Sequence, residues 1–375
     1  MGNRRYFRIL LFISLFILLI TSCSSQGWNS YNSNVAMFRG NPARTGEYAG
    51  IGPKELNGIV WKFNTNAWVQ SSPVVSHEVV YFCNYDSFLY AIDVKTGQEK
   101  WKFETDDGGW GWGWSSPTVV AEVVYFSSDD YLYAVNAKTG QEIWKFETGG
   151  HVQTSPAVVD GVVYFANNGY LYAVDAKTGQ EKWKFKAGDA GVSIPAVVDG
   201  VVYFGSKDGF LYGLDADTGQ EKWKFKAGDA GVSTPAVVDG VVYIGSYDGY
   251  FYAVDVKTGQ EKWKFEVGGP VGSSMAVVDG VVYFGSKDGF LYALDADTAQ
   301  EKWRFETGGM VVSSPALVDG VVYFGSEDSY FYALDADTGQ EKWKFKTGDA
   351  VMSSPAVVDG VVYFGSYDGY LYALK

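Results

Sequence analysis

The most repeated acidic motif of the chain is a five-residue segment whose carboxylates have a spacing suited to calcium. Its fullest copy reads DADTG, residues 215–219, and the motif recurs, with variations, seven times. Calcium binds carboxylate and carbonyl oxygens supplied from alternate positions of a short loop. Four of the seven copies, however, carry lysine in place of the second acid, and its ammonium group would repel a cation: Lys95, Lys138, Lys177 and Lys257. We therefore interpret the motif as a turn and predict neither calcium nor another metal ion.

Residues suited to nucleophilic catalysis are scarce. The chain has two histidines, His77 and His151, and two cysteines, Cys23 and Cys83. This leaves little for a zinc site or for a Ser-His-Asp triad, which needs an oriented histidine as its base. His77 stands in a turn that reads Asp-Gly elsewhere, and Cys83 stands where most copies of the repeat have glycine. A surface turn and a buried thiol are the interpretations we favour, and we predict no catalytic residue.

A second group of residues is better suited to binding. The stretch WGWGW alternates tryptophan with glycine, and equivalent segments elsewhere add another tryptophan, two glutamines and a histidine. Alternate residues of an extended strand point to one side, so the three indoles would form an apolar patch typical of an interaction site. The alternatives are that they plug a channel, fold onto neighbouring strands, or belong to a flexible loop. The candidate binding residues are Trp68, Gln70, Trp110, Trp112, Trp114, His151 and Gln153.

An internal repeat must position these residues. Each unit holds four short runs rich in Val, Tyr and Phe, separated by turn signals such as Asp239-Gly240, a pair that suits hairpins. The run VVYF is apolar throughout, so both of its faces must be covered, and the absence of helical patterns after residue 23 leaves other sheets as the cover. Four strands in about forty residues predict an all-β fold, a β-propeller of four-stranded antiparallel blades. One tryptophan marks each unit: Trp61, Trp101, Trp144, Trp183, Trp223, Trp263, Trp303 and Trp343.

The two ends of the repeat complement each other. Residues 57–63, NGIVWKF, form a fourth strand with no first three before it, whereas the chain stops at Lys375 after three strands with no fourth. Together they complete one blade, so we predict an eight-bladed ring closed by residues 57–63, with no odd exposed edge. A solenoid, the alternative, would need capping units rather than complementary ends.

The first 22 residues have the pattern of an export signal. A basic start precedes the apolar run Ile9–Ile20, which is too short for an ordinary membrane span. The following ITSC resembles the lipobox of bacterial lipoproteins, which implies that Cys23 is lipidated; an ordinary signal with an incidental cysteine is the alternative. Ser24, rather than aspartate, implies by the same resemblance the outer membrane. We expect residues 1–22 to be removed and residues 23–36 to form the lipidated start and a polar tether.

The charge of the chain argues against one class of partner. Its net charge is −14, and removing residues 1–22 takes away three arginines and no acids, which leaves −17. Nucleic acid phosphates would repel so acidic a body, so we expect no nucleic acid partner.

The phrase LDADTGQEKWKF, Leu214–Phe225, resembles the tryptophan-docking repeat of pyrroloquinoline quinone (PQQ)-like propellers, and MFRGNPARTG, residues 37–46, resembles their lead-in. The resemblance covers residues 37–375 and implies that the eight recurring tryptophans are structural, each indole lying between blades with its N–H bonded to backbone. By this resemblance, a quinone enzyme of the family would need adjacent cysteines, a carboxylate that binds calcium, an asparagine and a catalytic aspartate. The chain has no Cys-Cys pair and no long inserted loops, so we expect neither PQQ nor enzymatic activity.

The length, the lipobox and the eight blades also resemble the propeller lipoproteins of the outer-membrane β-barrel assembly machinery. That resemblance implies a non-catalytic scaffold in the cell envelope, anchored to the membrane by lipid, whose blade-connecting loops bind a protein partner. A glycan-binding propeller and a PQQ-dependent dehydrogenase are the alternatives. We expect a monomer.

Overall fold

The computed structural model describes residues 35–106, 115–150, 152, 154–188, 193–228 and 231–375. Within these ranges the regular elements are all strands, and no helix of the described residues has the length and apolarity to cross a membrane. Residues 32–375 make up one compact unit. The expected signal over residues 1–22, Cys23 and all but the last two residues of the expected tether lie outside the described residues.

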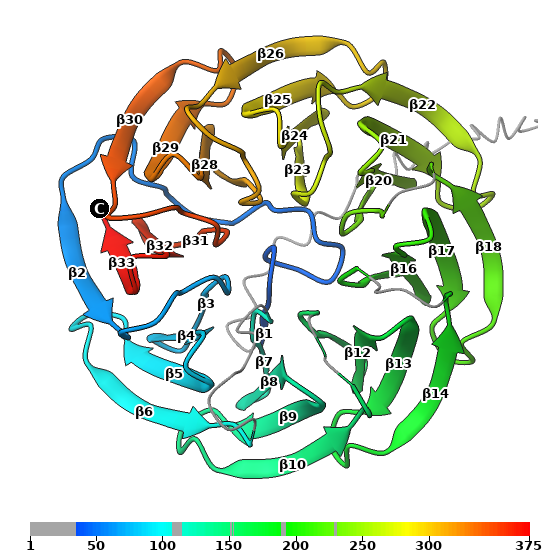
Figure 1. Cartoon of the computed structure of the whole chain (residues 1–375), viewed down its shortest axis with the longest axis horizontal. Helices are drawn as coiled ribbons and strands as arrows, with labels where there is room; N and C mark the ends of the chain where they lie inside the picture. The colour runs from blue at the N-terminus through cyan, green and yellow to red at the C-terminus, as the bar shows by residue number, and fades with distance from the viewer. Residues whose placement is uncertain (1–34, 107–114, 151, 153, 189–192, 229–230) are drawn as a thin grey trace, which may run out of the picture. The chain divides into compact units, whose positions relative to one another are not determined.

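Eight antiparallel sheets are arranged as blades around a central channel (Figure 1). This confirms the predicted eight-bladed ring. Numbered in chain order, the first four blades are blade one, β3 (Val74–Ser76), β4 (Val79–Cys83), β5 (Phe88–Asp93) and β6 (Glu99–Glu104); blade two, β7 (Thr118–Val120), β8 (Val123–Ser128), β9 (Tyr131–Asn136) and β10 (Glu142–Glu147); blade three, β11 (Ala157–Val159), β12 (Val162–Asn167), β13 (Tyr170–Asp175) and β14 (Glu181–Lys186); and blade four, β15 (Ala196–Val198), β16 (Val201–Gly205), β17 (Phe210–Asp215) and β18 (Glu221–Lys226).

The remaining blades repeat this order from the channel outward, and blade eight takes its outermost strand from the N-terminal side of the chain. They are blade five, β19 (Ala236–Val238), β20 (Val241–Gly245), β21 (Tyr250–Asp255) and β22 (Glu261–Glu266); blade six, β23 (Met275–Val278), β24 (Val281–Gly285), β25 (Phe290–Asp295) and β26 (Glu301–Glu306); blade seven, β27 (Ala316–Val318), β28 (Val321–Gly325), β29 (Tyr330–Asp335) and β30 (Glu341–Lys346); and blade eight, β31 (Ala356–Val358), β32 (Val361–Gly365), β33 (Tyr370–Leu374) and β2 (Ile59–Asn64). The short β1 (Val35–Ala36) adds a fifth strand to blade two, beside β7.

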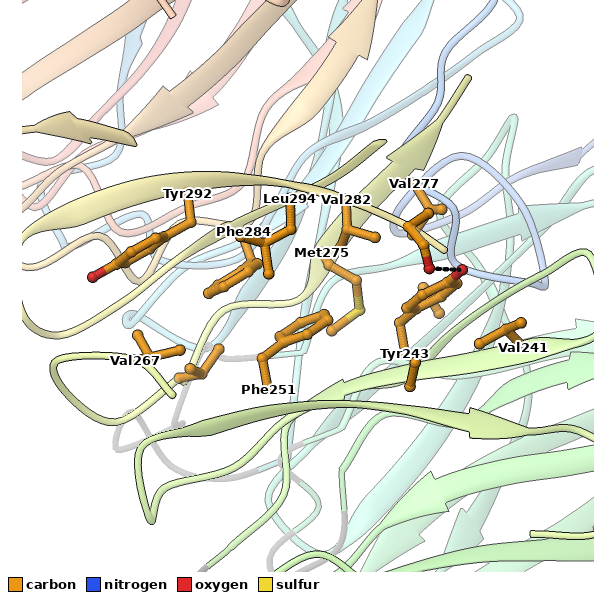
Figure 2. Close-up of a cluster of buried hydrophobic side chains, with 14 residues drawn as sticks. Val241, Tyr243, Phe251, Val267, Met275, Val277, Val282, Phe284, Tyr292 and Leu294 are labelled. Atoms are coloured by element: carbon orange, nitrogen blue, oxygen red, sulfur yellow. Dashed lines mark hydrogen bonds between the residues drawn. The ribbon is translucent and has the colours of Figure 1, made fainter. Parts of the chain in front are cut away.

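The core lies between neighbouring blades, as the apolar VVYF runs require. Figure 2 shows Phe251 of blade five against Phe284 of blade six, and Tyr243 of blade five beneath Val277 of blade six; the rings of Phe251 and Phe284 stack at 4.3 Å between centroids. Outermost strands such as β18 instead alternate exposed charges with half-buried aromatics. Two-sided burial of the middle strands therefore holds each blade against both of its neighbours.

An indole hydrogen bond to a backbone carbonyl joins each blade to the next, and at six of the eight junctions a tyrosine hydroxyl donates to the same carbonyl. In blade one, the Trp101 indole N–H and the Tyr81 hydroxyl donate to the same carbonyl, that of Ala137 in blade two, at 3.0 and 3.1 Å. We call this arrangement the blade latch. It recurs at five further acceptors, Ala176, Ala216, Ala296, Ala336 and Pro53, while Trp61 and Trp223 donate to Val94 and Val256.

The ring closes as the sequence predicts. Strand β2 pairs with β33, with Trp61 opposite Ala373 and Phe63 opposite Leu371. Blade eight has no turn between its third and fourth strands, because those strands come from opposite ends of the chain. Pro53, just before β2, supplies the missing acceptor: its carbonyl binds the indole N–H of Trp343 at 2.9 Å and the Tyr323 hydroxyl at 3.1 Å.

Deleting residues 57–63 tests this closure. The deletion removes most of β2 and leaves β33 as an exposed edge, so we expect a clearly lower melting temperature and an open ring. Circular dichroism measures the melting curve, and small-angle scattering measures the opening. A length-matched deletion of residues 24–30 is the control and should leave the melting curve unchanged. Equal curves for the two deletions would show that β2 does not close the ring.

One turn provides a test of backbone strain. Gly339 in blade seven has φ of 69°, and a Cβ there would lie 2.6 Å from the Trp303 indole of the preceding blade. Ala299 occupies the equivalent position in blade six and keeps a φ of 60°, a left-handed conformation that costs about 1–2 kcal/mol for a residue with a Cβ.

We therefore expect Ala299→Gly to raise the free energy of unfolding by about 1 kcal/mol, since the entropy of glycine offsets part of the relieved strain. Gly339→Ala, the matched reverse change, should lower it by at least as much, because the new methyl group meets the Trp303 ring. Urea denaturation measures both. A lower denaturation midpoint for Ala299→Gly would contradict the strain at this turn.

Candidate functional site

One face of the ring carries Trp68 and Gln70, the two candidate binding residues that the structure describes. The loops that connect consecutive blades meet there with the turns between the second and third strands of the blades. The Tyr85 N–H donates to the Trp68 carbonyl, and the Val69 N–H donates to the Ser366 carbonyl, both at 3.1 Å. These bonds join the loop before blade one to turns of blades one and eight. We call this side the loop face.

An aromatic cluster stands on the loop face at the junction of blades eight and one. The Trp68 indole stacks on the Tyr367 ring, with centroids 4.7 Å apart and planes 3° apart, and meets the Tyr85 ring edge-on at 5.5 Å. The Gln70 Oε1 accepts hydrogen bonds from the hydroxyls of Tyr367, at 2.8 Å, and Tyr85, at 3.2 Å. We call Trp68, Gln70, Tyr85 and Tyr367 the Trp68 cluster.

The Trp68 cluster combines exposure with fixed geometry. Trp68 is 49% exposed although two rings and the loop backbone hold it. Burial, followed by the charges of Tyr85, Glu327 and Asp349, raises the pKa of Tyr367 to about 12. Its hydroxyl is therefore protonated at neutral pH and remains a donor to Gln70. The result is a neutral, oriented aromatic surface.

The structure brings together only part of the predicted binding group. Trp68 and Gln70 lie in the Trp68 cluster, whereas Trp110, Trp112, Trp114, His151 and Gln153 lie outside the described residues. The sequence analysis missed Tyr85 and Tyr367. Their signal was available, since both occupy a turn position that reads lysine in blades four and six, but they contact the same Trp68 and Gln70 only because the ring closes.

The central channel is crossed by residues 37–53, drawn in blue in Figure 1. The innermost strand of each blade has a free edge toward the channel, and such an edge needs hydrogen-bond partners. Carbonyls of the crossing segment accept from four successive blades, with donor-to-acceptor distances of 2.9–3.0 Å: Pro42 from Val197, Ala43 from Val237, Thr45 from Val277 and Gly46 from Leu317. The segment thereby becomes part of the channel wall.

Two arginines of this segment are completely buried. The Arg39 guanidinium donates to the carbonyls of Met275 and Pro315. Arg44 donates to those of Pro156 and Pro195, each at 3.1 Å, and to that of Phe38 at 2.5 Å. Burial lowers the pKa of Arg39 to about 10 and, with the charge of Arg39, that of Arg44 to about 9. Both groups are therefore still charged at neutral pH.

A cavity of about 200 Å³ lies beside the crossing segment, with Phe38 of that segment and Gln70 among the residues that line it. Six buried serines from six successive blades line it, and we call them the serine arc. Five backbone N–H groups link them from blade to blade, each donating to the next hydroxyl oxygen at 2.8–3.0 Å. The serine arc is Ser274, Ser314, Ser354, Ser72, Ser116 and Ser155; Ile194 and Thr234 stand at the equivalent positions of blades four and five.

The comparison with protein families decides the classification. The model of the family described as outer membrane protein assembly factor BamB matches residues 53–128, 107–186, 167–271 and 247–375, which together span the whole ring. The chain belongs to this BamB family. The search of curated proteins gave no match.

Solved structures with the same fold as this BamB family member fall into different functional classes. BamB from Moraxella catarrhalis is 20% identical, covers 85% of this chain and 97% of its own, and has a TM-score of 0.69. The quinohemoprotein alcohol dehydrogenase from Comamonas testosteroni is 18% identical, covers 90% and 80%, and has a TM-score of 0.76. The computationally designed Ika8 protein is 20% identical, covers 83% and 96%, and has a TM-score of 0.75. At these identities the likeness shows the fold alone.

The described residues of this BamB family chain do not fit a calcium-held quinone. The cavity lining contains hydroxyls, an amide and apolar groups but no carboxylate, and the chain has no adjacent cysteines. Across the described residues, no group of three or more His, Cys, Asp and Glu is placed to hold a metal ion. Cys83 is buried, and burial raises the pKa of its thiol, so it is not a thiolate at neutral pH.

Proposed function

We propose that the protein is a non-catalytic scaffold of the cell envelope whose loop face binds a protein partner in outer-membrane protein assembly. The family match supports this role, and the Trp68 cluster is the observation that carries it. Tryptophan and tyrosine contribute a large part of the binding energy at protein interfaces, above all where they are oriented before the partner arrives.

The Trp68 cluster has the properties of such an anchor. Stacking on Tyr367 and edge contact with Tyr85 hold the indole, so binding costs little side-chain entropy. About half of the Trp68 surface is open to a partner. The hydroxyls around it already share Gln70 as an acceptor, so an apolar partner surface can cover them without leaving a donor unpaired.

The remaining parts of the proposal rest on the sequence. We propose that residues 1–22 are removed on export, that Cys23 is lipidated and inserted in the outer membrane, and that the residues up to 36 tether the ring. The protein acts as a monomer without quinone or metal cofactor and without nucleic acid. Trp110, Trp112, Trp114, His151 and Gln153 enlarge the binding surface.

Glycan binding is the second candidate, and the flat, half-exposed Trp68 ring favours it, because sugar faces stack on such rings. A PQQ-dependent dehydrogenase has less support, since the described cavity lining lacks the carboxylate that a calcium-held quinone needs.

Cross-linked affinity purification from membranes tests the scaffold role. We expect an envelope protein to co-purify with the wild-type chain and Trp68→Ala to weaken its binding about 30-fold, the equivalent of about 2 kcal/mol for an interfacial anchor. Tyr247→Ala is the matched control: Tyr247 is another exposed aromatic, 43% exposed, in blade five across the ring. A variant with Trp110, Trp112 and Trp114 changed to Ala tests those residues separately.

The outcomes separate the two candidates. Capture that Trp68→Ala and Tyr247→Ala weaken equally would contradict a partner site at the Trp68 cluster. Binding to insoluble polysaccharide that only Trp68→Ala abolishes, with no protein captured, would favour the glycan-binding function. Melting curves of the variants show that each is folded.

A further inference from the structure

Two positive charges are buried in the channel, and the part of the chain that the structure describes offers them no carboxylate partner. Arg39 and Arg44 are 1% and 0% exposed, and all their hydrogen bonds go to backbone carbonyls. Neither forms an ion pair with a carboxylate among the described residues; the only charged neighbours that act on them are each other and Tyr48. A buried cation is costly unless an opposite charge compensates it.

The serine arc presents unused donors near these charges. Each arc serine except Ser274 accepts a backbone N–H from the preceding blade. Within the described part of the chain, however, no hydroxyl of the arc donates to a protein acceptor, although a serine hydroxyl can rotate to do so. The Gln70 amide oxygen is engaged by two tyrosines, which leaves its NH₂ group as a further donor.

The chain connectivity brings the charges and the donors together. Arg39 binds the carbonyls of Met275 and Pro315, the residues directly after Ser274 and Ser314. Arg44 binds those of Pro156 and Pro195, directly after Ser155 and Ile194. Successive residues of an extended strand are about 3.3 Å apart, so the carbonyls that hold the two guanidiniums belong to residues directly next to the serine positions. Arg39 is thus held at blades six and seven and Arg44 at blades three and four, and Phe38, the residue before Arg39, lines the cavity itself.

We infer that the channel cavity binds a compact oxyanion, of the class of phosphate, sulfate or a small carboxylate. Hydroxyl donors and nearby cations form the environment that stabilises an oxyanion. A metal cation would find no carboxylate in the described lining, and water alone would leave the two arginines uncompensated. The volume of about 200 Å³ also leaves room for an organic group attached to the anion. The inference does not rest on the partner surface proposed above, although Gln70 belongs to both.

Titration with phosphate, sulfate and succinate tests the site, with sodium chloride at matched ionic strength as the reference. We expect one saturable site per chain by calorimetry and a rise in melting temperature that follows occupancy. The anion that binds most tightly identifies phosphate, sulfate or carboxylate as the preferred source. Selenate in place of sulfate gives an anomalous X-ray signal, which we expect next to the serine arc.

Paired serine variants locate the binding. Ser314→Ala removes a cavity donor and should weaken binding about tenfold, the usual scale of a hydrogen bond to a charged group. Ser313→Ala is the matched control, because the Ser313 hydroxyl bonds Ser353 and Gly325 rather than lining the cavity. Ile194→Ser places a new hydroxyl above Arg44 and should tighten binding several-fold, which tests the site even if Ser314→Ala fails to fold.

Two results would overturn the inference. One is the absence of saturable binding of all three anions to the folded wild-type protein. The other is binding with the same affinity in Ser313→Ala, Ser314→Ala and Ile194→Ser, which would place the anion elsewhere on the molecule.

Discussion

The ring depends on the blade latch, in which an indole N–H and a phenol O–H of one blade share a backbone carbonyl of the next. Each blade alone would expose two apolar sheet faces, and packing against its neighbours buries them. Apolar packing has no direction, whereas two donors that converge on one acceptor fix the rotation of each blade. The indole bond recurs at every junction and lets nearly identical units close into a circle. The Trp303 indole also packs closely against the next turn, where a Cβ on Gly339 would lie 2.6 Å from it.

The same requirement explains the path of the N-terminal segment. Every blade must offer an acceptor to the one before it, but blade eight lacks the turn that carries this carbonyl elsewhere. Pro53 takes that role, and the chain reaches Pro53 only after crossing the channel. The crossing residues therefore meet the free inner edges of the blades and bury Arg39 and Arg44 against backbone carbonyls there. The same segment, residues 37–53, thus supplies both the acceptor that closes the ring and the positive charges of the channel.

Local signals were sufficient to predict most of the fold. Apolar runs, Asp-Gly turns and the recurring tryptophans are short-range patterns, and the incomplete first and last units indicated the closure by residues 57–63. The candidate site was harder to predict from the sequence. Trp68 and Gln70 stand out as departures from the repeat, but Tyr85 and Tyr367 lie at opposite ends of the repeat and reach the same indole only in the closed ring. The serine arc was hidden for another reason: serine recurs before each inner strand, and only the fold shows which serine of each pair lines the cavity.

Departures from the repeat also determine where the molecule can act. Eight equal blades would present eight equal surfaces, and a symmetric ring gives a partner no reason to choose one orientation. Here the loop before blade one brings Trp68 and Gln70 to the junction of blades eight and one, where Tyr85 and Tyr367 fix them. Gln70 also borders the channel cavity, so the aromatic surface and the channel share one residue at this junction. The junction of blades eight and one, next to the pairing of β2 with β33, is thus the place where the nearly uniform ring presents a surface that the other blades do not repeat.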